Sequence, residues 1–255
     1  MRNWRIVAIA FIALLLGIGT SALLLQVLTR ETMPRTAAVP KPTRQSSTAS
    51  SQPTPSPHYT QEQLDYFLEI ALNSEYGGSD EIIKKWEGDV KIQSFGTPTL
   101  EDLDTLRQVT QEINGLTRGA IQLELVTSNP NVEIYFVPES DFKQYEPNYV
   151  PVNLGFFWTW WSDRRVLYRA RILITTVGVT QRERSHLIRE ELTQSLGLMQ
   201  DSYRYPDSIF YQGWTDVNQY TDIDRALISL LYRPELSSGM SRAEAIAALQ
   251  PLVAH

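Results

Sequence analysis

The chain has 255 residues, enough for one sizeable domain or two small ones, and carries 29 Asp and Glu against 23 Lys and Arg. Six of those basic side chains but only one acidic side chain precede residue 58, so residues 58–255 carry a formal charge of −11. Because phosphate binding needs a basic surface, this charge argues against nucleic acid as a partner. The absence of cysteine from the sequence excludes disulfides and thiolate metal sites.

The N-terminal part is expected to anchor the protein in a membrane. Residues 6–28 form an uncharged and mainly apolar run, and about 20 such residues span a bilayer. A cleavable signal has an apolar region of only about 7–15 residues, so residues 1–29 are predicted to be a short tail and an uncleaved transmembrane helix, with cleavage near Ser21 as the alternative. The short basic tail favours a cytoplasmic N-terminus. We therefore expect a single-pass membrane protein whose domain is extracytoplasmic, in the periplasm or at the cell surface.

Residues 30–57 are rich in Pro, Ser, Thr, Ala and Gln and show no apolar periodicity. A segment of this composition cannot bury enough apolar surface to offset the entropy lost on ordering. It is predicted to be a disordered linker, which leaves residues 58–255 as one domain.

The domain alternates between helical and strand patterns. Helices are predicted at 59–71, 99–116 and 222–232, with strands at 90–95, 121–126, 132–137 and 165–175. Thr60 is a plausible cap for the first helix. Thr99 and Asp102 form a capping box for the second, which is expected to end at Asn114-Gly115.

An aromatic run, GFFWTWW, occupies residues 155–161. Two interpretations stay open for it. The rings could fill one edge of the sheet as core, or exposed Trp could stack on sugar rings or lie at a membrane interface.

The most informative stretch is 186–201, which reads HLIREELTQSLGLMQD. Metzincin-type zinc peptidases carry H-E-x-x-H-x-x-G-x-x-H, because His at i and i+4 share one helix face and the intervening Glu acts as general base on a metal-bound water. In that frame this chain has Glu190, Glu191, Gln194, Gly197 and Gln200, followed by Asp201. Glu191 stands in the place of the base and Gly197 in that of the turn glycine.

The three ligand places hold Glu, Gln and Gln, and a neutral amide is a poor zinc ligand. His186 shares a helix face with Glu190 and Gln194, but the only other histidines are His58 and His255. His186 is therefore expected to be a hydrogen-bonding residue. No metal or other cofactor is predicted, with zinc as the alternative.

Glu191 is the candidate catalytic residue. It would be a buried acid or base in a cleft, or it would pair with an arginine such as Arg184 or Arg189. A glycosidase reaction would require a second carboxyl group, from Asp201 or Asp207.

The order of a strand, a long helix, two or three strands and then this helix resembles the zincin catalytic domain. Residues 207–211 stand where metzincins have the Met-turn, with Ile209 or Phe210 in the methionine position, and 222–232 resembles their last helix.

A longer motif string resembles an uncharacterised bacterial domain-of-unknown-function family, number 2927. It comprises EELTQSLGL at 190–198, DS at 201–202, SIF at 208–210 and LYRP through GM at 231–240. The resemblance implies an α+β, zincin-like (metzincin-type) domain with a mixed sheet and an EExxQ helix in place of HExxH, and it implies no particular activity.

The leading functional hypothesis is a pseudo-metallopeptidase that binds a peptide or a cell-envelope polymer without hydrolysing it. The first alternative is an active hydrolase, an atypical metallopeptidase or a glycan hydrolase, that uses Glu191. The second is a structural domain of the cell envelope.

Overall fold

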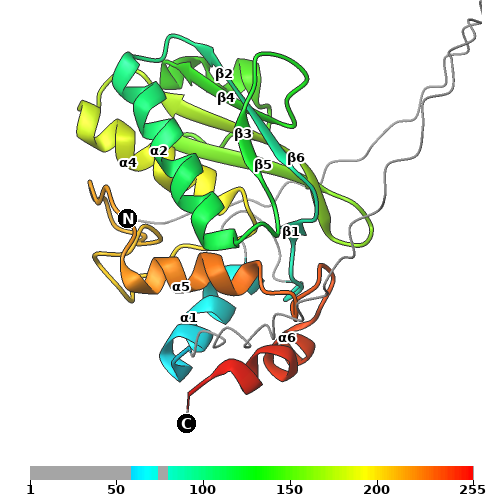
Figure 1. Ribbon diagram of the computed structural model, residues 1–255. Coiled ribbons are helices and arrows are strands. Elements are labelled where there is room, and N and C mark those ends of the chain that lie inside the picture. The colour runs from blue at the N-terminus through cyan, green and yellow to red at the C-terminus, as the bar shows by residue number, and fades with distance from the viewer. Residues whose placement is uncertain (1–58, 74–79, 255) are drawn as a thin grey trace, which may run out of the picture. The chain divides into compact units, whose positions relative to one another are not determined.

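The computed structural model describes residues 59–73 and 80–254 (Figure 1). The predicted anchor at 1–29 and linker at 30–57 lie outside these residues, as do His58 and His255. Within the described part of the chain, no helix combines the length and the apolar character that a membrane crossing requires.

The centre of the fold is a six-stranded sheet. Its strands are β1 (Lys85–Trp86), β2 (Val90–Gly96), β3 (Leu123–Leu125), β4 (Val132–Val137), β5 (Gly155–Trp161) and β6 (Val166–Thr175). β2 pairs in parallel with β3 on one side and β4 on the other, and β4 pairs in parallel with β6. β1 continues the parallel pairing at the start of β6, whereas β5 runs antiparallel to β6. The domain is therefore a mixed α/β fold with a largely parallel sheet.

Helices cover the sheet and extend beyond one end of it (Figure 1). They are α1 (Gln61–Leu72), α2 (Leu100–Thr117), α3 (Phe142–Tyr145), α4 (Gln181–Gln194), α5 (Asp222–Leu231) and α6 (Arg242–Leu249), with short 3-10 turns at Glu139–Asp141 and Gln250–Leu252. α2 packs against both α4 and α5, and α1 packs against α5 and α6. Each of the five longer helices begins with a complete capping box, in which a Thr or Ser and the residue three positions later satisfy each other's backbone N–H.

The aromatic run at 155–161 forms β5, so its side chains alternate between the two faces of the sheet. Phe157 joins the main hydrophobic core, while Phe156 belongs to a smaller cluster with Phe142 and Tyr149. Trp158 stacks on Phe156 at a ring-centroid distance of 6.4 Å. Most of the run is thus packed at one edge of the sheet, and Trp161 at its end is exposed.

Two predicted elements have different bounds in the structure. α2 does not end at Asn114-Gly115 but continues to Thr117, and Arg118 takes the left-handed conformation after it, with φ 52°. The Asn114 side chain bonds the backbone of Leu123 instead, donating to its carbonyl at 2.9 Å and accepting from its N–H at 2.8 Å. Asn114 therefore links the start of β3 to α2 through these hydrogen bonds. The strand predicted at 121–126 is shorter in the structure and spans Leu123–Leu125.

Candidate functional site

The candidate site is built on α4. Capped by Thr180 and Glu183, this helix lies between α2 and the β5–β6 side of the sheet, and most of its residues are buried. The four leucines of the segment, Leu187, Leu192, Leu196 and Leu198, are all buried in the core, as their spacing predicts. This packing fixes the face that α4 turns towards the start of β5.

A cavity of about 240 Å³ opens between α4, the approach to β5 and the loop after residue 210. It is lined by His186, Glu190, Glu191, Gln194 and Asp201, together with residues 152–155 and 211–215. The structure thus brings five of the seven predicted site residues to one cavity. Gly197 and Gln200 do not line it.

Glu191 packs over the first residue of β5. A Cβ added at Gly155 would lie 2.4 Å from Glu191 Oε1 and 3.0 Å from its Cγ, so a larger residue there would force the Glu191 side chain to shift. The two arginines considered as partners of Glu191 pair with α2. Arg184 Nε donates to Asp102 at 2.8 Å, and Arg189 Nη1 donates to Glu112 at 2.7 Å. The carboxyl group of Glu191 therefore faces the cavity side of α4, while these arginines face α2.

His186 is held by two acceptors. Its Nδ1 lies 2.6 Å from the Val217 carbonyl oxygen and its Nε2 lies 3.3 Å from Glu190 Oε2. Burial favours the neutral ring, but the hydrogen bond and the charge of Glu190 outweigh it and raise the pKa of His186. An imidazolium satisfies both acceptors, because each ring nitrogen then donates a proton. In this arrangement neither nitrogen offers a lone pair to a metal ion.

Gln194 occupies the second ligand place of the zinc-protease frame, and its Nε2 donates to Asp201 Oδ1 at 2.5 Å. Gln200, at the third place, turns away, since its Nε2 donates to the Asp201 carbonyl and its N–H to the carbonyl of Ile70. Asp201 rather than Gln200 therefore faces the cavity. Over residues 59–73 and 80–254, no group of three or more His, Cys, Asp or Glu is arranged to hold a metal ion.

Gly197 shapes the turn after α4. Its φ of 121° is in the region that favours glycine, as predicted for this turn, and an added Cβ would lie 2.0 Å from the Lys84 carbonyl oxygen. The chain can therefore turn back against β1 and bring Asp201 to the cavity. The role of Gly197 is to shape the backbone.

The segment predicted to stand in the Met-turn position packs beneath α5. Ile209 and Phe210 are fully buried, and Ser208 Oγ donates to Asp224 Oδ1 at 2.6 Å. Burial raises the pKa of Asp224, although its hydrogen bonds act in the opposite direction. Asp207, one of the two carboxyl groups considered for a glycosidase, is not part of the cavity wall, whereas Asp201 is.

Sequence reasoning missed the outer wall of the cavity. Tyr211 and Trp214 line it, and Trp214 is exposed while its Nε1 donates to Glu183 Oε1 at 3.2 Å. The available signal was an aromatic residue in a short polar loop, YQGWTD, which by itself does not indicate what the ring faces. Gly155 was not predicted to lie at the site either, because the pattern at 155–161 indicated only an aromatic run.

Comparison with known proteins identifies the family. The family described as "Protein of unknown function (DUF2927)" matches residues 60–251, and the chain belongs to it. The family suggested by the motifs from 190 to 240 is thus confirmed. No curated relative matches the chain.

Two solved structures show a distant likeness in fold. The one described as "Structure of Myroilysin" is 12% identical with a TM-score of 0.39, and the likeness covers 59% of this chain and 83% of that chain. The one described as "Crystal structure of myroilysin" is 11% identical with a TM-score of 0.41, covering 69% of this chain and 98% of that chain.

Proposed function

We propose that residues 58–255 form a zincin-like, metzincin-type domain that binds an extended peptide carrying a basic group and does not hydrolyse it. The observation that carries the proposal is the acidic cavity at the start of the edge strand β5. The zincin-like assignment rests on the element order and on α4, which carries the EExxQ frame and ends in the Gly197 turn.

The charge of the cavity favours a cation. Glu190, Glu191 and Asp201 contribute three carboxyl groups, and His186 is the only basic side chain in the wall. Even when His186 is counted as protonated, the formal charge of the wall remains negative. A Lys or Arg side chain, or a peptide α-ammonium group, would complement it.

The size of the cavity favours one side chain over a whole ligand. Drug-sized ligands occupy pockets of about 300–1,000 Å³. The volume of about 240 Å³ is smaller than that range. A longer partner would therefore place a single group in the cavity and lie along the surface beside it.

β5 offers such a surface. In the described part of the chain it pairs only with β6, so its other edge has no strand partner and an added strand could pair there. A peptide that adds to a sheet edge gains main-chain hydrogen bonds, and pockets beside the edge select its side chains. Because Asn153, Leu154 and Gly155 line the cavity, a strand added along β5 would lead directly to the carboxyl groups.

The residues at the positions where zinc peptidases carry metal ligands favour binding without metal chemistry. Gln194 is a neutral amide that hydrogen-bonds Asp201, and both ring nitrogens of His186 face acceptors. A catalytic zinc site requires three protein ligands and an open fourth position. The residues in this frame do not supply that set.

The hydrolase alternative rests on a different observation. Glu191 and Asp201 line the same cavity, and glycoside hydrolysis needs two carboxyl groups that flank one bond. In that case Glu191 would act on a glycan without a metal.

The N-terminal residues complete the proposal. The apolar run at 6–28 and the polar segment at 30–57 would tether the domain outside the cytoplasmic membrane, where extended peptides and cell-envelope polymers are its candidate partners.

Fluorescence anisotropy would test the proposal. The probes are fluorescein-labelled heptapeptides rich in Val and Thr, with Lys, norleucine or Glu at the centre, added to the full-length protein. We expect the Lys peptide to bind most tightly and Asp201→Asn to weaken it by about tenfold, as expected for loss of a charge-assisted contact. Glu101→Gln is the matched control, because Glu101 is exposed on α2 and outside the cavity wall.

Equal affinity for the Lys and norleucine peptides would refute the proposed specificity. Mass spectrometry of the peptides and of glycan oligomers after long incubation provides the second arm. Cleavage that disappears in Glu191→Gln would establish the hydrolase instead.

A further inference from the structure

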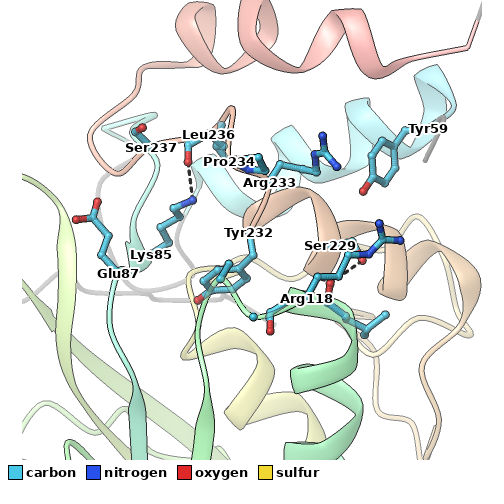
Figure 2. Close-up of a pocket in the computed structure, with 14 residues that line it drawn as sticks. Tyr59, Lys85, Glu87, Arg118, Ser229, Tyr232, Arg233, Pro234, Leu236 and Ser237 are labelled. Carbon is cyan, nitrogen blue, oxygen red and sulfur yellow. Dashed lines mark hydrogen bonds between the residues drawn. The ribbon is translucent and has the colours of Figure 1, made fainter. Parts of the chain in front are cut away.

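A second and larger cavity lies away from α4. Its volume is about 510 Å³, and it is formed by the C-terminal ends of α2 and α5, the strand β1 and the chain after α5 (Figure 2). Its wall mixes aromatic and aliphatic side chains, including Leu116, Tyr232 and Leu236, with Lys85, Arg118 and Arg233. Cavities of this size are typical of small-molecule sites.

Lys85 lies buried in the wall of this cavity. Its Nζ donates to the carbonyl oxygens of Leu231 at 3.1 Å and Leu236 at 2.5 Å, and lies 5.7 Å from the centroid of the Tyr232 ring. Burial lowers the pKa of Lys85 to about 8, against a smaller opposing effect of Glu87, so the ammonium form still predominates at neutral pH. Two of the three donors of this ammonium group serve the carbonyls, and Lys85 contributes a buried positive charge to the wall.

Arg118 supplies a second positive charge. Following α2 in the left-handed conformation, it is exposed, and within residues 59–73 and 80–254 it forms no ion pair. Arg233, by contrast, is bound to Glu235 through two hydrogen bonds of 2.9 and 2.7 Å. Arg118 is therefore the guanidinium group in the wall that can accept an anionic ligand.

Tyr59 lies in the same wall as Arg118 and Arg233. Burial raises the pKa of its phenol, while the charges of Arg233 and Arg118 act in the opposite direction. Figure 2 shows Tyr59 and Arg118 on one side of the cavity and Lys85 on the other. Glu87 is the one acidic side chain in the wall, and it is exposed.

The geometry points to a binding site for a small organic carboxylate with an apolar body, with the carboxylate held by Arg118, the body against Leu116 and Tyr232, and Lys85 adding positive charge to the opposite wall. The cationic wall contrasts with the formal charge of −11 on residues 58–255. A positive cavity in an acidic domain selects for anions, whereas the α4 cavity selects for cations. This inference does not depend on the proposed peptide site.

Isothermal titration calorimetry of the full-length protein with 4-phenylbutyrate tests the inference. The neutral analogue 4-phenylbutyramide and the cationic analogue 4-phenylbutylamine have similar apolar bodies. We expect the carboxylate to bind and each analogue to bind at least tenfold more weakly, since a charge-assisted contact is lost.

Arg118→Asn is the informative variant, because Asn tolerates the left-handed conformation and removes the charge. It should weaken 4-phenylbutyrate binding by about tenfold while the melting temperature stays unchanged. Arg164→Asn, an exposed arginine outside the cavity wall, is the matched control and should bind as the parent does.

Two results would overturn the inference. One is the absence of 4-phenylbutyrate binding to the parent protein. The other is equal affinity of Arg118→Asn and Arg164→Asn for the carboxylate.

Discussion

The carboxyl group of Glu191 lies directly over the backbone of Gly155, so closely that a Cβ at residue 155 would come within 2.4 Å of Oε1. This contact joins the last turn of α4 to the first residue of β5. It sets where the carboxyl group lies at the cavity.

Gly155→Ala is therefore expected to destabilise the protein by roughly 1–3 kcal/mol, the usual cost of overpacking a filled interior. In a Glu191→Ala background the same substitution should cost much less, because the clashing atoms have been removed. A double-mutant cycle measured by urea unfolding gives the coupling energy. Additive costs would show that the two residues do not constrain each other.

Gly197→Val should strongly destabilise the protein. The new side chain meets the Lys84 carbonyl at 2.0 Å, and a β-branched residue is strained at a φ of 121°. Gly115→Ala is the control, since nothing lies within 4 Å of its added Cβ and the residue is inside α2. It should stabilise the protein by roughly 0.5–1 kcal/mol. A Gly197→Val variant as stable as the parent would contradict the described turn.

The His186–Glu190 pair should make stability depend on pH. The pKa of His186 is raised in the folded state, so its contribution is fully present below the unfolded value of about 6.5 and is lost as the pH rises through the folded value. Glu190→Gln should therefore lower the free energy of unfolding relative to the parent more at pH 6 than at pH 9. Urea unfolding at the two pH values measures the difference. A gap that does not change with pH would show that the pair does not stabilise the imidazolium.

Treatment with a chelator tests whether the α4 cavity binds zinc. We expect the purified protein to carry substoichiometric zinc, and a chelator to leave its melting temperature unchanged, because a structural metal would otherwise be linked to folding. Glu191→Gln should leave stability nearly unchanged or raise it, since it removes the cost of burying a carboxylate charge. One tightly bound zinc per chain, lost together with an activity in Glu191→Gln, would support the metallopeptidase alternative.

The membrane tether predicts a fractionation result. The full-length protein should stay in the membrane fraction after a carbonate wash, because the run at 6–28 is long enough to span the bilayer. Protease added from the outer face should release an intact domain of about 200 residues by cutting at 31–57. Recovery of a soluble, N-terminally processed protein would refute the anchor.

The helix starts that the sequence predicts correctly are those marked by residues close together in the chain. Thr60 and Thr99 cap α1 and α2 where the pattern places them, because a capping box is complete within four residues. Ser241 and Glu244 form the same box at the start of α6, a signal that was present but missed. The end of α2 was misplaced because Asn114 bonds Leu123, a contact that depends on how β3 packs.

The α4 cavity was only half predictable for a related reason. His186, Glu190, Glu191 and Gln194 share one helix, so helical periodicity relates them. Gly155 and Trp214 reach the same cavity from other parts of the chain, and only the tertiary fold brings them there. The choice of Asp201 over Gln200 likewise follows from the conformation of the turn, and residue type does not reveal it.

The five capping boxes have a consequence for the order of folding. Each helix start is specified by residues that lie next to one another in the chain, so it can form while the rest of the polypeptide is still open. The pairing of β4 with β6 joins residues far apart in sequence and has to await closure of a long loop. We expect correctly bounded helices to assemble first and the parallel sheet to determine the folding rate.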